Sequence, residues 1–375
     1  MDRVRVLLVG IGGYGENYIK EFFEHDIKNA ILVAVADPFI EKSSYKDQIR
    51  DRQIPVYRSP EAFFLSGGKA DLTVISSPIH THYEYILTAL GNGSNVLVEK
   101  PVTISVVKME RLIEAERKSS LFVAVGYQLC FARDVLELKR KVLSGELGNP
   151  VRMKALRMMR RTDKYYARTS WAGKLACHGE YVFDSPVSNA CAHQIQVMLF
   201  FLGHDMESTG NVKSVDGVLY KARRDIENYD AAAICIHTDE NVDLYYYTAH
   251  CLDEKKVGPL IEMEFEKGVI KSCDDNFCVE YNDGRIEDYS SHAKGERLQK
   301  LYDSIDAVLS GTRPVVTLST SLAHIRCVIE TEKLPVYLRY DAERKIAEDD
   351  DGYWSIESLK DEYFNAYDNW TVPER

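Results

Sequence analysis

A glycine-rich turn directly behind an apolar run is the feature that most constrains how this chain folds. The run Val4 to Val9 is followed by Gly10-Ile11-Gly12-Gly13-Tyr14-Gly15, which has the spacing Gly-x-Gly-x-x-Gly. In such a turn Gly10 lets the chain leave a strand sharply, Gly12 leaves room for a pyrophosphate, and Gly15 lets the next helix pack closely on the sheet. The first amides of that helix, expected from Glu16 to His25, then face the phosphates. An ordinary tight loop is the alternative interpretation.

A second apolar run favours the dinucleotide over the ordinary loop. Residues Ala30 to Ala36 are apolar and lead to Asp37, close to the spacing of about 20 residues at which an acid meets the adenosine ribose. Asp37 favours NAD over NADP, because its carboxylate accepts from a free 2′-hydroxyl and repels a 2′-phosphate. Lys42 and Lys46 lie close enough in the sequence to keep NADP as the less favoured cofactor.

The order of the apolar runs predicts a Rossmann domain over residues 1–126. With 375 residues the chain is too long for one ordinary core, so two domains are expected. Strand-like runs alternate with helical stretches, which is typical of a parallel sheet with helices on its faces. The runs are Val4 to Val9, Ile31 to Ala36, Leu72 to Ser76, Asn95 to Val98 and Leu121 to Val125.

Residues 127–375 are predicted to form an α+β domain for substrate binding and oligomerisation. Its closely spaced strand candidates predict a large, mostly antiparallel open sheet. We expect a helix from about Asn189 to Leu202, and two late helices, about Gly295 to Leu309 and Ser319 to Leu334, that pack on this sheet or bridge the domains. Residues 341–375 form an acidic, aromatic extension, whose aromatics suggest that it lies against something. An open sheet face must be covered, which favours a homodimer or homotetramer.

Composition and charge exclude several classes of partner. The chain has 47 Lys and Arg against 58 Asp and Glu, a formal net charge of −11, so nucleic acid is not an expected partner. No apolar run approaches the roughly 20 residues that span a membrane. No basic segment with an apolar stretch precedes the first strand, so we expect a cytoplasmic protein. The eight cysteines include no Cys-x-x-Cys pair, and we expect reduced thiols and no metal.

Three further motifs, taken in order, resemble those of the Gfo/Idh/MocA family of nicotinamide oxidoreductases. Ser76-Ser77-Pro78-Ile79-His80-Thr81-His82 is similar to the family's Thr-Pro-Asn-x-x-His, with Pro78 and His82 matching and Ile79 standing where Asn is usual. Glu99-Lys100-Pro101 is similar to its Glu-Lys-Pro, and Asn189-Ala190-Cys191-Ala192-His193 resembles its Asp-x-Gly-x-His. The resemblance covers roughly residues 4 to 340.

The resemblance implies roles for these residues and a class of substrate. Lys100 would exchange a proton with a substrate hydroxyl or carbonyl beside the nicotinamide, and His193 would bind the reacting oxygen or share its proton. Glu99 would orient that lysine or cap the strand end, and Gln128, in Gly126-Tyr127-Gln128, would border the nicotinamide ribose or the substrate. Ser76, Ser77, Pro78 and His82 would join the cofactor site. Sugars, polyols such as inositol, and their acids are the implied substrates.

The histidine segment departs from the family pattern. Asn189 replaces the usual aspartate and Cys191 the usual glycine. Asn189 and His193 stand four apart on the predicted helix, so both are expected on one face. An asparagine can orient a hydroxyl but cannot carry a proton, so acid and base chemistry falls to Lys100 and His193.

A local basic island lies between Arg152 and Arg168 of this acidic chain. It is either a solvated strand edge or a recognition surface, in which Arg160 or Arg161, with Tyr165 or Tyr166, reaches an acidic or phosphorylated part of the substrate. The sequence as a whole predicts an NAD-dependent dehydrogenase or reductase acting on CH-OH groups. The alternatives are a redox-neutral enzyme that oxidises, eliminates and reduces, and a regulator that binds dinucleotide without catalysis.

Overall fold

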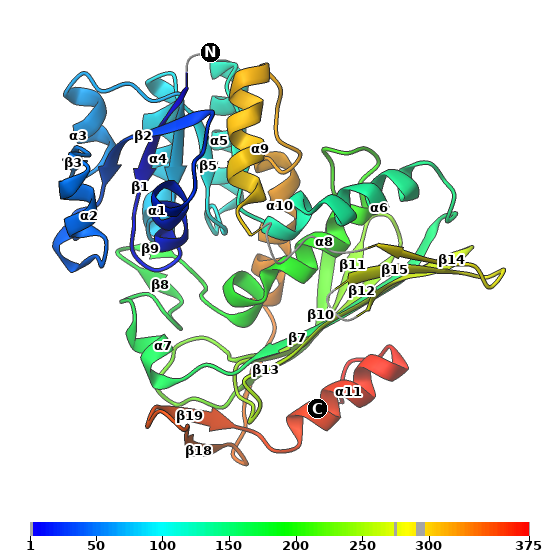
Figure 1. Ribbon diagram of the computed structural model, residues 1–375. Helices are drawn as coiled ribbons and strands as arrows, with labels where there is room; N and C mark the ends of the chain where they lie inside the picture. Colours follow the sequence, from blue (N-terminus) through cyan, green and yellow to red (C-terminus); the bar gives the residue numbers. More distant parts are fainter. Residues whose placement is uncertain (1–2, 274–275, 290–296, 375) are drawn as a thin grey trace. The chain divides into compact units, whose positions relative to one another are not determined.

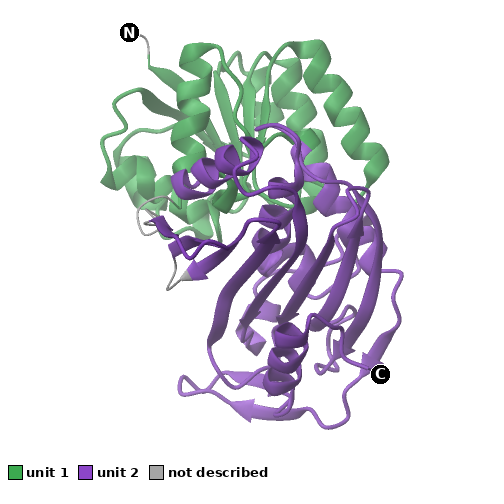
Figure 2. Ribbon diagram, turned by 90° about the vertical axis from the view of Figure 1, so that its right-hand side faces the viewer, with its two compact units in different colours: residues 1–131, 294–319 green, residues 132–293, 320–375 purple. Residues whose placement is uncertain are grey.

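Two separate stretches of the chain build the first of two structural units. The computed structural model describes residues 3–273, 276–289 and 297–374. The first unit consists of residues 1–131 and 294–319, and the second of residues 132–293 and 320–375 (Figure 2). The first unit therefore includes a late segment that the sequence assigned to the second domain.

A six-stranded parallel sheet is the centre of the first unit (Figure 1). Its order is β3-β2-β1-β4-β5-β6, and every neighbouring pair is parallel, as the apolar runs predicted. The chain order reverses beside β1, which pairs with β2 on one side and β4 on the other; open α/β sheets bind ligands at the carboxyl ends of such strands. The strands are β1 (Val4–Val9), β2 (Ala30–Ala36), β3 (Val56–Tyr57), β4 (Leu72–Ile75), β5 (Asn95–Val98) and β6 (Val123–Val125).

The helices of the first unit begin and end where local signals place them. Ser105 caps α5, because its side chain accepts from the Lys108 amide, and Ser120 ends that helix in a left-handed conformation. α4 stops before Gly93, whose φ is +77°. The helices are α1 (Gly15–Glu24), α2 (Lys46–Asp51), α3 (Pro60–Leu65), α4 (Ile79–Gly91), α5 (Val106–Ser119) and the short helices η1 (Ile40–Lys42) and η2 (Gln128–Phe131).

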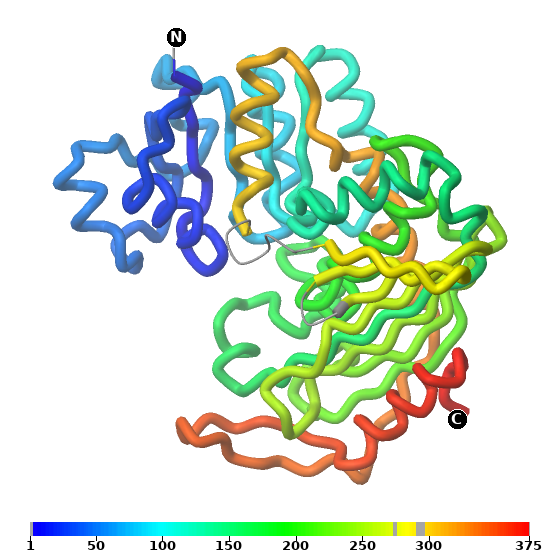
Figure 3. The backbone as a smooth tube through the Cα atoms, turned by 45° about the vertical axis from the view of Figure 1, so that its right-hand side comes forward, coloured from blue at the N-terminus to red at the C-terminus, as the bar shows by residue number. Residues whose placement is uncertain are grey.

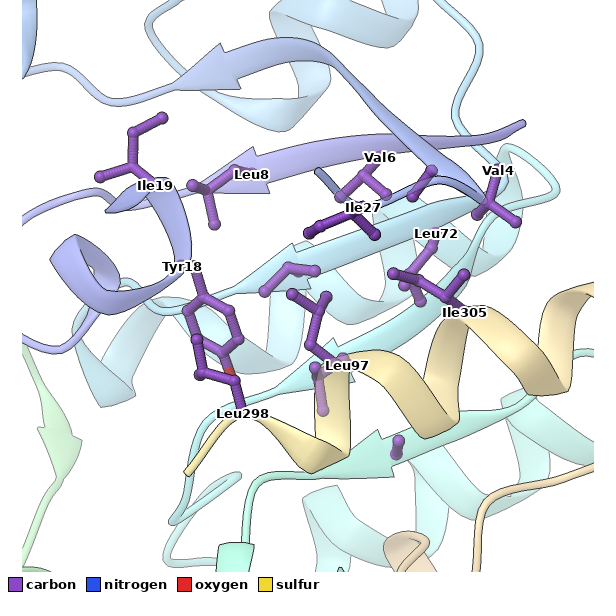
Figure 4. Close-up of a cluster of buried hydrophobic side chains, with 14 of the residues drawn as sticks. Val4, Val6, Leu8, Tyr18, Ile19, Ile27, Leu72, Leu97, Leu298 and Ile305 are labelled. Atoms are coloured by element: carbon purple, nitrogen blue, oxygen red, sulfur yellow. The ribbon is translucent and has the colours of Figure 1, made fainter. Parts of the chain in front are cut away.

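Helix α9 (Gln299–Ser310) belongs to the core of the first unit. Leu301 and Ile305 are buried in one cluster with Val6, Tyr18 and Leu97 (Figure 4). The sequence expectation that this helix packs on the second sheet is wrong, because an amphipathic pattern does not say which sheet its apolar face covers. That it bridges the domains stays a prediction. Residues 295 and 296 of the predicted helix lie outside the described residues.

The second unit is built on a nine-stranded sheet of order β16-β15-β14-β13-β7-β12-β11-β10-β17. The pairs β7 with β12 and β10 with β17 are parallel and the others antiparallel, which confirms the predicted mostly antiparallel sheet. The strands are β7 (Pro150–Met159), β10 (Val212–Lys221), β11 (Ala231–Thr238), β12 (Asp243–Ala249), β13 (Lys256–Phe265), β14 (Gly268–Cys273), β15 (Asn276–Tyr281), β16 (Ile286–Tyr289) and β17 (Val336–Leu338). Two small ribbons pair β8 (Ala176–Cys177) with β9 (Glu180–Tyr181) and β18 (Glu343–Ile346) with β19 (Gly352–Ser355).

Helices cover both faces of this sheet. Consecutive residues of β12 point to opposite faces: the Tyr246 hydroxyl donates to the Cys191 carbonyl, beside α8, whereas the Tyr247 hydroxyl donates to the Ala366 carbonyl of α11, at 3.0 Å. α11 lies along the sheet in Figures 1 and 3, so the C-terminal extension packs against the domain. The helices are α6 (Arg133–Leu143), α7 (Asp163–Ala167), η3 (Pro186–Ala190), α8 (Ala192–Leu202), α10 (Leu318–Thr331) and α11 (Leu359–Asn369). No helix among the described residues is long and apolar enough to cross a membrane.

Candidate dinucleotide and substrate sites

The glycine turn has the close approaches and the open space that its sequence predicted. Gly10 has a φ of +78°, and a Cβ there would lie 2.8 Å from the backbone nitrogen of Ser77. A Cβ on Gly15 would overlap the carbonyl oxygen of Gly10. A Cβ on Gly12 or Gly13 would meet nothing within 4 Å. The outer glycines therefore serve packing, and the inner two leave an open surface before the first turn of α1.

Two contacts connect other predicted cofactor residues to this turn. The Asp37 carboxylate accepts from the Ile11 amide at 2.9 Å and from the Phe39 amide at 2.8 Å, which holds the acid beside the glycines. The Tyr14 hydroxyl donates to Gln128 Oε1 at 2.9 Å. The turn, the acid after β2 and the amide after β6 thus meet at one end of the first sheet.

The end of β4 supplies an unpaired hydroxyl to the same edge. Ser76 Oγ is buried and has no hydrogen-bond partner within the described residues, whereas Ser77 Oγ lies 2.7 Å from Thr81 Oγ1. Pro78 is exposed immediately before α4. An open surface at Gly12, the N-terminus of α1, the Asp37 carboxylate and an unpaired hydroxyl suit the phosphates and ribose of a dinucleotide.

His82 links two of the motifs from the inside. It is 1% exposed, with Nε2 2.8 Å from the Ser77 carbonyl and Nδ1 3.0 Å from the Pro101 carbonyl. Burial lowers the pKa of His82, and a neutral imidazole donates from one nitrogen only. The histidine therefore spans the loops after β4 and β5.

A buried ion pair lies next to Lys100. Glu99 Oε1 accepts from Lys300 Nζ at 2.5 Å and from the Tyr18 hydroxyl at 2.6 Å, and the Lys300 side chain is fully buried. Because Lys300 comes from α9, no local sequence pattern marks this pairing. Lys100 itself is half-buried and directly follows Glu99, two residues beyond the end of β5.

In the second unit, Asn189 and His193 do not share one regular helix. Asn189 lies in the short π-helical η3, and His193 is the second residue of α8, which begins at Ala192. The predicted continuous helix is therefore wrong at its start, because Ser185 caps a separate turn at Pro186. Asn189 Nδ2 donates to Asp184 Oδ1 at 2.8 Å, so a carboxylate that sequence reasoning missed orients this amide.

The basic island divides into separate contacts. Arg152 binds Glu264 at 2.6 Å, and Arg160 donates to the Asp253 carbonyl at 2.7 Å while its guanidinium covers the Tyr353 ring. Arg161 instead lies 4.3 Å from the centre of the Tyr165 ring.

Further residues join Arg161. The Arg161 amide donates to the His250 carbonyl at 3.0 Å, and His250 Nδ1 is 3.0 Å from the Tyr166 hydroxyl. His250 is the first residue after β12. A polar residue at the end of a buried strand, as Asp37 and Lys100 also are, is the signal that sequence reasoning passed over.

One group of side chains on the second sheet has metal-ligand chemistry. Among the described residues, ligand atoms of Cys235, His237 and Asp243 lie within 4.8 Å of one another. The His237 ring nitrogens already face carboxylates, Asp243 at 2.7 Å and Asp216 at 3.1 Å. An ion-pair network accounts for this arrangement.

Sequence comparison relates the chain to known dehydrogenases. NAD(+)-dependent scyllo-inositol 2-dehydrogenase of Bacillus subtilis (strain 168) is 28% identical over 149 residues, covering 40% of this chain and 43% of the relative. Inositol 2-dehydrogenase of Klebsiella pneumoniae (strain 342) is 24% identical over 202 residues, covering 54% and 55%. The chain thus spans about half the length of the curated relatives it matches.

Structural comparison extends the likeness in fold across most of the chain. The WlbA dehydrogenase of Bordetella pertussis, solved with NADH and UDP-GlcNAcA, has a TM-score of 0.70 at 20% identity, covering 88% of this chain and 96% of that one. The model of the oxidoreductase family with an NAD-binding Rossmann fold matches residues 4–127. Residues 4–127 are therefore similar to the NAD-binding Rossmann fold of the Gfo/Idh/MocA oxidoreductase family.

Proposed function

We propose that this protein is an NAD-dependent oxidoreductase that moves a hydride between the nicotinamide and a carbon bearing a hydroxyl in a sugar, a polyol or a sugar acid. The observation that carries the proposal is the position of Lys100 at the carboxyl end of β5, in the same parallel sheet whose β1 end carries the glycine turn. The relatives named as inositol dehydrogenases support the same substrate class.

Lys100 acts as the base in this proposal. A free lysine titrates near 10.4, so proton removal at neutral pH requires that burial and the positive nicotinamide lower its pKa. The buried Glu99 with Lys300 holds the strand end from which Lys100 projects. As the Nζ amine removes the proton of the substrate hydroxyl, the hydride leaves the carbon that bears this hydroxyl and passes to the nicotinamide.

His193 and Asn189 hold the reacting oxygen. The imidazole of His193 donates to it or shares its proton, and the Asn189 amide, oriented by Asp184, binds a hydroxyl without carrying a proton. Asp37 supports NAD over NADP, because its carboxylate accepts from a free 2′-hydroxyl and repels a 2′-phosphate. We further propose a cytoplasmic location and a homodimer or homotetramer.

Replacement of Lys100 by Met tests the proposal. A panel of sugars, inositols and uronates is screened with NAD and with NADP for reduced-nicotinamide absorbance, and NAD binding is measured by calorimetry. Lys100→Met should abolish turnover with NAD affinity nearly unchanged. Lys118→Met, at a surface lysine paired with Glu114, is the control and should behave as the wild type. Full activity in Lys100→Met would refute the mechanism.

The same screen distinguishes the two alternatives. A redox-neutral enzyme would form product with tightly retained cofactor and without net reduction of NAD. A regulator would bind the dinucleotide without forming any product.

A further inference from the structure

A cluster of aromatic and basic side chains follows β7 and lies beside the end of β12. The Arg161 amide donates to the His250 carbonyl at 3.0 Å, so these residues are neighbours through the backbone. The His250 ring lies 5.6 Å from the Tyr165 ring centre, and His250 Nδ1 lies 3.0 Å from the Tyr166 hydroxyl. Arg168 joins them, with its guanidinium 3.4 Å from the centre of the Tyr165 ring.

Several donors of this cluster are buried without a hydrogen-bond partner within the part of the chain that the structure describes. They are Arg161 Nε, Trp171 Nε1 and His250 Nε2. The Trp171 ring centre lies 5.2 Å from the Arg168 guanidinium, and His250 is only 3% exposed. Buried polar atoms are almost always paired in folded proteins, because an unmade hydrogen bond is costly. Three such atoms in one cluster indicate a polar group that the protein is built to receive.

The electrostatics of the cluster favour an anionic group. Burial, then the charges of Arg161 and Arg168, lower the pKa of His250 well below its usual value, so the imidazole is neutral beside two guanidinium cations. If the Tyr166 hydroxyl donates to Nδ1, the proton of His250 is on Nε2, which then donates toward the ligand.

The carboxylate that faces Tyr165 offsets only part of these charges. Asp184 brings one negative charge against two guanidinium cations, and its oxygens accept from the Gly173 amide at 2.7 Å and from Asn189 Nδ2 at 2.8 Å. Asp184 also connects the cluster to Asn189, which the proposed function places at the reacting oxygen. An anionic group bound here would therefore belong to the molecule that reacts.

We propose that Arg161, Arg168 and His250 bind an oxyanion of the substrate, a carboxylate or a phosphate monoester, so that the substrate is an acidic sugar rather than a neutral one. This inference rests on the proposed function for the identity of the bound molecule. A guanidinium suits the role, because its planar N–H groups match the oxygens of both anions. Arg160, adjacent in sequence, has its own partners at the Asp253 carbonyl and the Tyr353 ring and takes no part.

The test compares Arg161→Met with Arg160→Met on matched substrates. D-glucuronate, D-galacturonate and glucose 6-phosphate are assayed beside D-glucose and D-galactose, with the full-length protein and NAD. The acids should be preferred over the neutral sugars. Comparison of the two uronates with glucose 6-phosphate shows whether a carboxylate or a phosphate is bound. Arg161→Met should lower kcat/KM for the preferred acid about tenfold to a hundredfold and change the neutral parent less than about twofold. Arg160→Met should change neither.

A binding measurement keeps this inference separate from the proposed function. If no compound is oxidised, calorimetric titration of the same five compounds into the protein with NADH still reports the subsite. Binding of an acid that Arg161→Met loses and Arg160→Met retains would support the subsite even though the proposed reaction had failed. A preference for neutral sugars, equal losses on acid and neutral parent in Arg161→Met, or absence of binding by every acid would overturn it.

Discussion

An inner and an outer glycine of the turn, Gly12 and Gly10, should respond to the same substitution in opposite ways. A methyl group on Gly12 meets nothing within 4 Å, and the φ of Gly12 lies outside the left-handed range, so Gly12→Ala fits the folded protein. Its stability should be unchanged or higher by about 0.4–1 kcal/mol, because the unfolded chain loses freedom. The same methyl occupies the space assigned to the pyrophosphate. The Kd for NAD should rise at least about tenfold, which is about 1.4 kcal/mol.

Gly10→Ala should damage the fold instead. Its φ of +78° costs a side chain about 1–2 kcal/mol, and the added Cβ would lie 2.8 Å from the Ser77 backbone, so the end of β4 must move. We expect the free energy of unfolding, measured by urea denaturation, to fall by at least about 2 kcal/mol. Gly91→Ala, at another glycine with no neighbour within 4 Å, is the control and should leave NAD binding unchanged. Wild-type NAD affinity in Gly12→Ala, measured by calorimetry, would refute the placement of the phosphates.

Two further predictions concern the buried ion pair of Glu99 with Lys300 and the network of His237 with two carboxylates. Lys300→Met should lower the unfolding free energy by about 3–5 kcal/mol in urea denaturation, because it leaves the Glu99 carboxylate buried without its cation. A smaller loss in the double variant with Glu99→Gln would confirm that the two residues are coupled. A loss under about 1 kcal/mol in Lys300→Met would contradict the prediction. Burial lowers the pKa of His237, but the hydrogen bonds and charges of Asp243 and Asp216 outweigh burial and raise it. The charged imidazole therefore stabilises the fold fully below about pH 6.5 and less as pH rises through the raised pKa. His237→Gln should lose more unfolding free energy, relative to the wild type, at low pH than at high pH. An equal loss at both pH values would count against the network.

The sequence predicted those parts of the fold that local patterns determine. β1 and β5 have the predicted bounds, because a strand buried on both faces is a short, mostly apolar run, which ends at Gly10 after β1 and at Glu99 after β5. The glycine turn, the N-terminus of α1 and Asp37 follow each other within one βαβ unit, so their spacing alone was enough to predict a dinucleotide site. Lys100 lies two residues after the end of β5 and needed no tertiary information to be placed at the edge of the sheet.

Long-range contacts lay beyond the sequence. The pairing of Glu99 with Lys300 joins residues that α9 brings together, and no local pattern marks a lysine for full burial. The break between Asn189 and His193 arises at Ser185 and Pro186, which favour a separate turn over a continuous helix. The sequence offered Arg160 and Arg161 as equals. Only the register that sets Arg161 against His250 distinguishes them.

The C-terminal extension changes the physical argument for assembly. A homo-oligomer was predicted because an open sheet face must be covered, yet α11 already buries the face of β7 and β12 around Tyr247. Lys154 is buried beneath α11, where it donates to the Tyr367 carbonyl at 3.1 Å. Farther along the same face, Lys271 binds Glu280 at 2.6 Å, so that region presents an ion pair rather than apolar side chains. The oligomeric state stays a prediction. Any second copy that docks on this face has to meet α11 and these charges, because the apolar surface beneath the helix is covered by the chain itself.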